Sequence, residues 1–132
     1  MVGIVVVSHS YQLAEETIKL SLQMAQSELT VINAGGTGDG SFGTDPMKIM
    51  DGIQQAESGD GVLMLLDIGS AVMSAEMAIE MSGVDPTQVV MANAALVEGC
   101  IAAITTASIG MTLAEVQKSA EEALLYPKVT TE

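Results

Sequence analysis

The chain has 132 residues, of which 17 are acidic, against four lysines and no arginine, so its formal net charge is -13. A chain of this length forms one domain with an ordinary hydrophobic core and needs no disulfide or metal to fold. The excess of acidic side chains argues against a nucleic-acid reader, because Lys and Arg make most contacts to phosphates.

The sequence also bears on the compartment. No apolar run reaches the ~18 residues of a membrane span, and residues 2–7 lack the basic flank of a signal peptide. Cys100 is the single cysteine, so it cannot form a disulfide within the chain. We therefore expect a soluble, cytoplasmic protein that binds neither nucleic acid nor membrane.

The first elements are a strand and a helix. Residues 2–7 form a continuous, β-branched apolar run, which is typical of a strand buried on both faces. Ser8-His9-Ser10 ends this strand, and a helix over about 11–26 follows, with Ser10 as its predicted N-cap.

A second strand over 29–34 leads into a long glycine-rich loop, 35–44. Asp45 and Pro46 are a predicted N-cap and first helical residue of a helix that ends near Ser58. We expect that helix to point four apolar side chains inward, namely Met47, Ile49, Met50 and Ile53.

The remaining elements continue the alternation. A third strand over 62–66 is followed by Asp67-Ile68-Gly69-Ser70 and a helix that ends near Gly83. A fourth strand over 88–92 leads into a helix that reaches about Ile109, and the capping-box sequence Thr112-Leu113-Ala114-Glu115 opens a last helix that extends to about Leu125.

Strict alternation of strands and helices predicts the α/β class, with a doubly wound parallel sheet, right-handed crossovers and helices on both faces. The simplest strand order is 2-1-3-4. In that order the switch point falls between the first and third strands, and such sheets handle ligands beyond the carboxyl ends of their strands. This places Ser8-His9-Ser10 beside Asp67-Ile68-Gly69-Ser70 before any motif is considered.

His9 is the only histidine, and at this position its imidazole is a candidate nucleophile or general base. Asp67 could accept a hydrogen bond from one ring nitrogen and leave the other lone pair facing outward. The plainer alternatives are a histidine that completes a turn and an aspartate that caps the next helix, although Ser70 could serve that cap equally well.

Other kinds of site find little support. The glycine-rich loop lacks Gly-Lys-Ser/Thr and does not directly follow the first strand, so it is neither a Walker loop nor a dinucleotide fingerprint. It remains a flexible flap, a partner-binding surface or an ordinary surface loop. One His and one Cys make a poor metal site, and we expect no metal or cofactor. Met73, Met77 and Met81 recur at helical spacing and indicate core or subunit interface.

Four segments carry a resemblance to a known family. The chain resembles the phosphotransfer subunit of phosphoenolpyruvate-dependent dihydroxyacetone kinase, a relative of the mannose-type enzyme IIA of the bacterial sugar phosphotransferase system. The matching pieces are GIVVVSHS (3–10), GTD (43–45), LDIGSA (66–71) and ALVEG (95–99). The resemblance implies a mannose-type enzyme IIA-like phosphotransfer domain over 1–125 and a tail over 126–132.

The resemblance implies that the phosphocarrier protein HPr phosphorylates His9, on Nε2. His9 then gives the phosphoryl group to ADP on a separate nucleotide-binding subunit, and the resulting ATP phosphorylates dihydroxyacetone on a third subunit. Some relatives carry fused carrier domains for which 132 residues leave no room, so we expect donors in trans. The alternatives are an enzyme IIA of the sugar branch and a flavodoxin-like module that binds without covalent chemistry.

The residues around His9 complete the predicted site. Asp67 is expected to orient the His9 ring, and main-chain N–H groups at the starts of the first and third helices are expected to bind phosphate. The apolar content of 48%, the methionine stripe and the family all point to a homodimer. The predicted phosphate- or partner-binding residues are Ser8, Ser10, Gly43, Thr44, Gly69 and Ser70.

Overall fold

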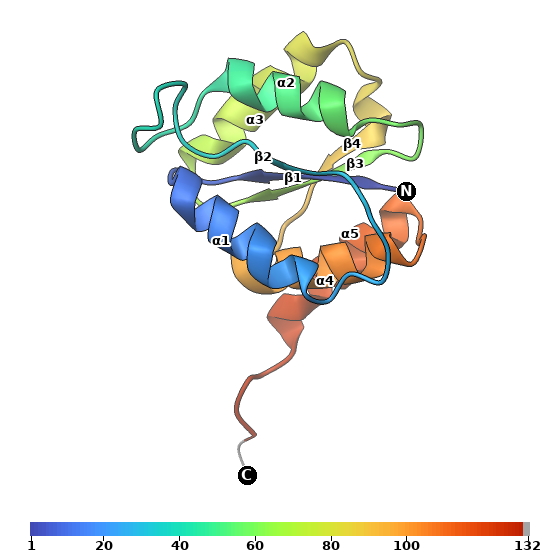
Figure 1. The fold of residues 1–132 in the computed structure, drawn as a ribbon. Helices are drawn as coiled ribbons and strands as arrows, with labels where there is room; N and C mark the ends of the chain where they lie inside the picture. The colour runs from blue at the N-terminus through green and yellow to red at the C-terminus, as the bar shows by residue number, and fades with distance from the viewer. Residues whose placement is uncertain (131–132) are drawn as a thin grey trace.

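A computed structural model describes residues 1–130 and places a four-stranded parallel sheet at the centre of the chain (Figure 1). The strand order is β2-β1-β3-β4, as the sequence predicted. The strands are β1 (Gly3–Val7), β2 (Val31–Asn33), β3 (Val62–Leu66) and β4 (Val89–Met91). The switch point therefore lies between β1 and β3.

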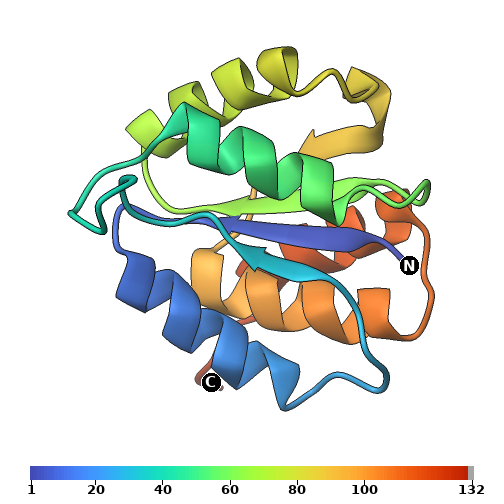
Figure 2. The ribbon, with the colours of Figure 1, turned by 45° about the horizontal axis from the view of Figure 1, so that its top comes forward.

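Helices cover both faces of the sheet. One face is covered by α2 (Pro46–Ala56) and α3 (Ser70–Ser82), and the other by α1 (Tyr11–Leu22), α4 (Leu96–Ser108) and α5 (Leu113–Glu122) (Figures 1 and 2). Short 3₁₀ turns, η1 (Pro86–Gln88) and η2 (Ala123–Leu125), precede β4 and follow α5. The predicted α/β class is confirmed.

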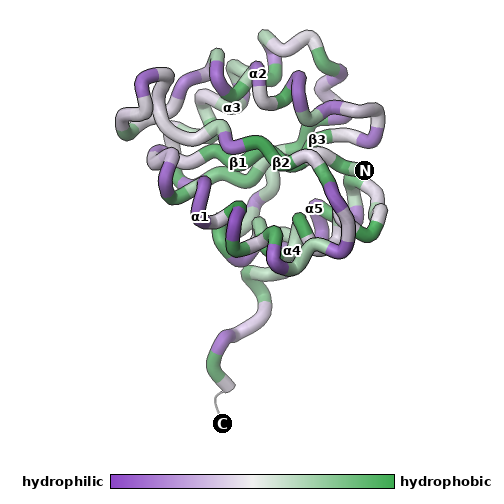
Figure 3. Tube along the Cα trace, viewed as in Figure 1, coloured by the Kyte–Doolittle hydropathy of each residue, from purple (hydrophilic) through white to green (hydrophobic). Residues whose placement is uncertain are grey.

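The core consists of two hydrophobic layers separated by the sheet. β1 and β3 are buried on both faces, so alternate side chains enter opposite layers, and both strands are hydrophobic in Figure 3. Val6 and Leu65 face α1, α4 and α5, whereas Val7 and Leu66 face α2 and α3. This packing fixes the two strand ends that carry the candidate residues.

The predicted helix starts are confirmed at three positions. Ser10 Oγ accepts the N–H of Leu13, and Asp45 accepts the N–H of Met47 ahead of Pro46. Thr112 and Glu115 form a capping box at the start of α5.

Several predicted boundaries were too long. α1 ends at Leu22 rather than 26, because the following segment turns away to Ser108, whose Oγ accepts the N–H of Gln26. β2 is only Val31–Asn33, and the last helix finishes as the turn η2.

The prediction that Met47 points inward was wrong. Met47 is 55% exposed, whereas Ile49 is fully buried. Two residues correspond to a rotation of about 200° around a helix, so the two side chains lie on opposite faces of α2.

The predicted tail begins at Tyr126, and residues 126–130 are exposed and extend away from the domain (Figure 1). Lys128 forms an ion pair with Glu98 of α4 at 2.5 Å. Residues 131–132 of the predicted tail lie outside the described residues. Within the described part of the chain, no helix has the length and apolarity needed to cross a membrane.

Candidate active site

The carboxyl ends of β1 and β3 bring the two predicted loops together. Val7 pairs with Leu66 in the parallel register, so the residues that follow each strand are neighbours at one edge of the sheet. The main-chain N–H of Asp67 donates to Val7 O at 3.2 Å and extends the pairing by one step. The sequence prediction that His9 and Asp67 meet is confirmed.

Asp67 contacts His9 at two points. His9 Nδ1 lies 2.9 Å from Asp67 Oδ1, and the main-chain N–H of His9 donates to Asp67 Oδ2 at 2.8 Å. The side chains are partly buried, with 29% of His9 and 16% of Asp67 exposed. Because a carboxylate only accepts hydrogen bonds, Nδ1 carries a proton, and in the uncharged form of the imidazole Nε2 keeps its lone pair.

The surroundings of Asp67 keep its carboxylate ionised. Partial burial alone would raise the pKa of Asp67, but hydrogen bonds outweigh this effect and lower the pKa below its ordinary value of 3.8. These bonds come from the main chain and ring of His9, from the N–H of Ile68 and from the hydroxyl of Ser8. Asp67 is thus a fixed, charged acceptor at neutral pH.

Ser8 is fully buried and its hydroxyl holds the Asp67 carboxylate in place. Its hydroxyl donates to Asp67 Oδ2 at 2.9 Å and accepts the N–H of Ser10 at 3.0 Å. The hydroxyl therefore both donates and accepts a hydrogen bond within the protein. Ser8 therefore positions Asp67, and the hydroxyl of Ser10 caps α1.

Ser70 contacts the other nitrogen of the ring. Its Oγ lies 2.5 Å from His9 Nε2, so with Nδ1 protonated the hydroxyl donates to the Nε2 lone pair. Neither alternative considered for the cap of α3, Asp67 or Ser70, is found: Gly69 is the N-cap residue and no side chain caps this helix. The Ser70 hydroxyl instead occupies the place where an electrophile would approach the imidazole.

Two helices begin close to the His9 ring. α1 begins at Tyr11, just after His9, and α3 begins at Ser70, just after Asp67. The first N–H groups of a helix have no acceptor within that helix, and the helix dipole makes this end favourable for an anion. Gly69 and Ser70 therefore stay in the site as groups that can face a phosphoryl oxygen.

The glycine-rich loop is attached to the site by its main chain. Gly36 N–H donates to Ser8 O at 2.9 Å, and Gly43 N–H donates to His9 O at 2.8 Å. Gly43 has a φ of +134°, a conformation that favours glycine. Thr44 Oγ1 lies 2.7 Å from Ser74 Oγ of α3. Gly43 and Thr44 thus hold the loop to the strand and helix beside His9.

Lys48 completes this edge of the sheet, and sequence reasoning missed it. Its Nζ donates to Gly35 O at 2.7 Å and lies 4.8 Å from the centre of the Tyr11 ring. Lys48 therefore connects α2 to the loop and to the start of α1. No pattern in the sequence reports these contacts, because they depend on how α1 and α2 meet across the sheet edge.

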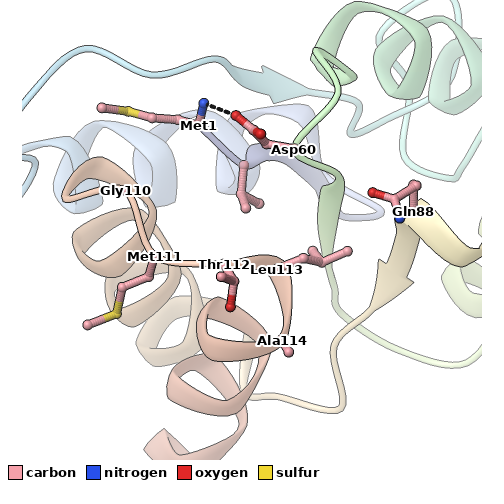
Figure 4. Close-up of a pocket in the computed structure, with 9 residues that line it drawn as sticks. Met1, Asp60, Gln88, Gly110, Met111, Thr112, Leu113 and Ala114 are labelled. Atoms are coloured by element: carbon pink, nitrogen blue, oxygen red, sulfur yellow. Dashed lines mark hydrogen bonds and ion pairs between the residues drawn. The ribbon is translucent and has the colours of Figure 1, made fainter.

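A separate pocket of about 410 Å³ lies at the opposite, amino-terminal edge of the sheet (Figure 4). Its wall includes the amino group of Met1, which pairs with Asp60 at 2.6 Å, and Thr112, whose side chain is held in the capping box. These polar groups already have partners, and His9 is not among the lining residues. The candidate site is the exposed edge at His9.

The lowered pKa of Asp67 predicts a pH-dependent contribution to stability. A carboxylate whose pKa is lower in the folded state stabilises the fold at pH values above its ordinary pKa, and the gain is lost as pH falls through the lowered value. Urea unfolding of wild type and Asp67→Asn should therefore show their largest difference at neutral pH and a smaller one at a pH well below the ordinary pKa of 3.8. An equal difference at both pH values would contradict this assignment.

Residues 3–117 match the model of the family EIIA-man, described as "PTS system fructose IIA component". The chain belongs to the EIIA-man family. The matched range holds β1 to β4 and every residue of the candidate site.

Two relatives of this EIIA-man chain carry related names. It is 36% identical to the "PEP-dependent dihydroxyacetone kinase, phosphoryl donor subunit DhaM" of Providencia stuartii, over 94% of this chain and 27% of that protein. It is 33% identical to the "PTS-dependent dihydroxyacetone kinase, phosphotransferase subunit DhaM" of Lactococcus lactis, over 93% of this chain and 96% of that protein. The chain thus spans about a quarter of the first relative and nearly all of the second.

A solved structure also resembles this EIIA-man chain. The crystal structure of EF1359, a protein of unknown function, superimposes with a TM-score of 0.79 at 35% identity and covers 92% of this chain and 95% of that one. The recognised family and the predicted fold are therefore both confirmed: the chain is an EIIA-man domain of the group that contains the DhaM subunits.

Proposed function

We propose that this chain is a phosphohistidine relay that accepts a phosphoryl group from HPr on His9 and donates it to ADP on the nucleotide-binding subunit of a dihydroxyacetone kinase. The names of the DhaM relatives support the dihydroxyacetone branch over the sugar branch. The observation that carries the proposal is the contact between His9 Nδ1 and Asp67, which leaves the Nε2 lone pair as the nucleophile. The phosphotransfer domain comprises residues 1–125.

The first transfer is an exchange between two imidazoles. The Nε2 lone pair of His9 forms a bond to phosphorus while the N–P bond of phosphorylated HPr breaks, and that electron pair returns to the nitrogen of HPr. The Nδ1 proton stays between the His9 ring and Asp67, so the carboxylate stabilises the positive charge that develops on the ring.

The resting contact with Ser70 has to open for this step. The Ser70 hydroxyl releases Nε2 and rotates toward a phosphoryl oxygen, where it meets the N–H groups at the start of α3. These neutral donors hold the phosphoryl group without the strong binding that a cluster of arginines would give.

The second transfer reverses the chemistry at His9. A β-phosphate oxygen of ADP attacks phosphorus, the Nε2–P bond breaks, and the electron pair returns to the ring. The Nδ1 proton makes the imidazole a good leaving group, while repulsion between the Asp67 carboxylate and the phosphoryl charge keeps the intermediate reactive. ADP belongs to the partner in this scheme, so the chain itself holds no nucleotide or other cofactor.

Incubation of the chain with phosphoenolpyruvate, enzyme I and HPr tests the proposal. One phosphoryl group per chain should appear, and it should be lost in acid and retained in alkali, as expected for a phosphoramidate on His9. An acid-stable phosphate, or no phosphate at all, would contradict the relay.

We further propose that the chain forms a homodimer through α3. Met73, Met77 and Met81 are 68%, 54% and 44% exposed on this helix, so the predicted methionine stripe lies on the surface and is not part of the core. A helix face of this kind suits a self-complementary twofold contact.

Light scattering at micromolar concentration should give about twice the 13.6 kDa of one chain. Met77→Lys should shift the protein toward the monomer, because it places a charge in an apolar contact. Met24→Lys is a matched control, since Met24 is 50% exposed beyond the end of α1. A monomeric mass for the wild-type chain would remove this proposal.

A further inference from the structure

The glycine-rich loop presents a large apolar side chain to solvent beside His9. Phe42 is the only phenylalanine of the chain, and it is 84% exposed. The next residue, Gly43, donates its N–H to the main-chain oxygen of His9 at 2.8 Å. Phe42 is therefore adjacent in the chain to a residue that contacts His9 directly. The loop runs between β2 and α2, next to the start of α1 (Figures 1 and 2).

The loop that carries Phe42 is held in shape by its own hydrogen bonds. Thr37 N–H donates to Ser41 O and Gly40 N–H donates to Thr37 O, both at 3.0 Å. Asp39 accepts the Thr37 hydroxyl at 2.6 Å and the Ser41 N–H at 3.0 Å. A loop ordered before binding loses little entropy when a partner docks, so Phe42 is a preorganised contact rather than the end of a flexible flap.

Two other exposed apolar side chains lie at the same edge. Ile68 directly follows Asp67 and is 71% exposed, and Met47, in the first turn of α2, is 55% exposed. Gly43, next to Phe42, and Asp67, next to Ile68, both contact His9. Thr44, at the end of the loop and just before α2, contacts Ser74 of α3. We call Phe42, Met47 and Ile68 the apolar rim.

The charge beside the apolar rim is negative. Hydrogen bonds from the side chains of Thr37 and Ser41 and from the N–H of Ser41 lower the pKa of Asp39 to about 2, so this exposed carboxylate stays ionised. Lys48 is the lysine at this edge, where its Nζ donates to Gly35 O and lies over the Tyr11 ring. Among the described residues, Lys19, Lys118 and Lys128 form ion pairs with Glu side chains away from the site. A protein that fits this surface therefore has an apolar patch bordered by Lys or Arg.

We propose that Phe42 anchors the phosphoryl-donor protein on the apolar rim and that this partner adds positive charge around His9, where this chain, with a net charge of -13, offers only Lys48, already bonded to Gly35 O. This inference rests on the proposed relay, because only a phosphoryl exchange requires a partner to cover His9. Large aromatic side chains at the centre of an interface contribute most of the binding energy, and nearby smaller contacts exclude water.

The test measures how the rate of His9 phosphorylation depends on the concentration of phosphorylated HPr, for wild type and Phe42→Ala. We expect KM to rise about tenfold while kcat stays within about twofold, because the substitution removes docking energy and leaves the His9 and Asp67 geometry intact. Ile109→Ala is the matched control. Ile109 is 54% exposed and lies beside the pocket at the opposite edge of the sheet, so the KM of this variant should equal that of wild type.

A small-molecule donor separates docking from chemistry. Phosphoramidate transfers its phosphoryl group to histidine with ammonia as the leaving group and needs no protein surface. Wild type and Phe42→Ala should react with it at equal rates. A slower reaction of Phe42→Ala would show that Phe42 acts on the chemistry at His9 and would overturn the anchoring role.

An unchanged KM for Phe42→Ala with HPr would overturn the anchoring role. A conversion of a wild-type dimer to a monomer by Phe42→Ala, with KM unchanged, would overturn it in favour of a contact between two copies of this chain.

Discussion

Replacing His9 by glutamine should abolish HPr-dependent phosphorylation of the chain. His9 is the only imidazole in the sequence, and the amide of glutamine keeps polar contacts with neighbours but offers no nucleophilic nitrogen. No phosphorylation of His9→Gln should be detectable, whereas replacing a residue that only positions His9 should leave a slow but measurable rate.

As a control, circular dichroism and the midpoint of urea unfolding show whether His9→Gln is still folded. His9 side-chain contacts lie at the exposed sheet edge, so the secondary structure should be unchanged. Intact-mass spectrometry checks the result. Wild-type labelling of His9→Gln, or phosphate on Ser8, Ser10 or Ser70, would show that another residue accepts the phosphoryl group.

Replacing Asp67 by alanine should slow transfer in both directions, by about 10- to 10⁴-fold, as for other lost orienting partners of a histidine. Without the carboxylate, the ring can rotate or adopt the other tautomer, and no fixed negative charge faces Nδ1 as the ring becomes positive. The main-chain N–H of His9 and the Ser8 hydroxyl also lose their acceptor, so the start of α1 is held less firmly.

Asp67→Asn separates the two effects of this substitution. The amide retains one oxygen acceptor and the size of the side chain but removes the negative charge. Rapid-quench rates that are slow in both variants identify the charge as the important property. Rates within about twofold of wild type for Asp67→Ala, with unchanged circular dichroism, would show that Asp67 has no part in transfer.

The order of the strands and the place where their carboxyl ends meet could be predicted from the sequence. Parallel strands buried on both faces read as continuous apolar runs, and alternation with helices leaves few permitted topologies, so the order 2-1-3-4 and the meeting of His9 with Asp67 could be predicted. The helix caps at Ser10 and Thr112 were also predictable, because a cap is set by neighbouring residues.

The finer parts of the site were not predictable, because they depend on contacts between distant segments. Nothing local shows that the Ser70 hydroxyl meets Nε2 or that Ser8 is buried against Asp67. Likewise, Lys48 reaches Gly35 and Tyr11 only after α1 and α2 take their places on opposite faces of the sheet. Local pattern also failed at Met47, whose apolar character does not reveal which face of α2 it occupies.

The most direct test of the account is a single-turnover chase from phosphorylated His9. The purified phosphorylated chain, freed of HPr, is mixed with the nucleotide-binding subunit and ADP, and its intact mass and the ATP formed are followed together. If His9 is a relay, each chain loses one phosphoryl group from His9 as one ATP appears. Retention of the phosphoryl group on His9, or its release as inorganic phosphate without ATP, would contradict the relay.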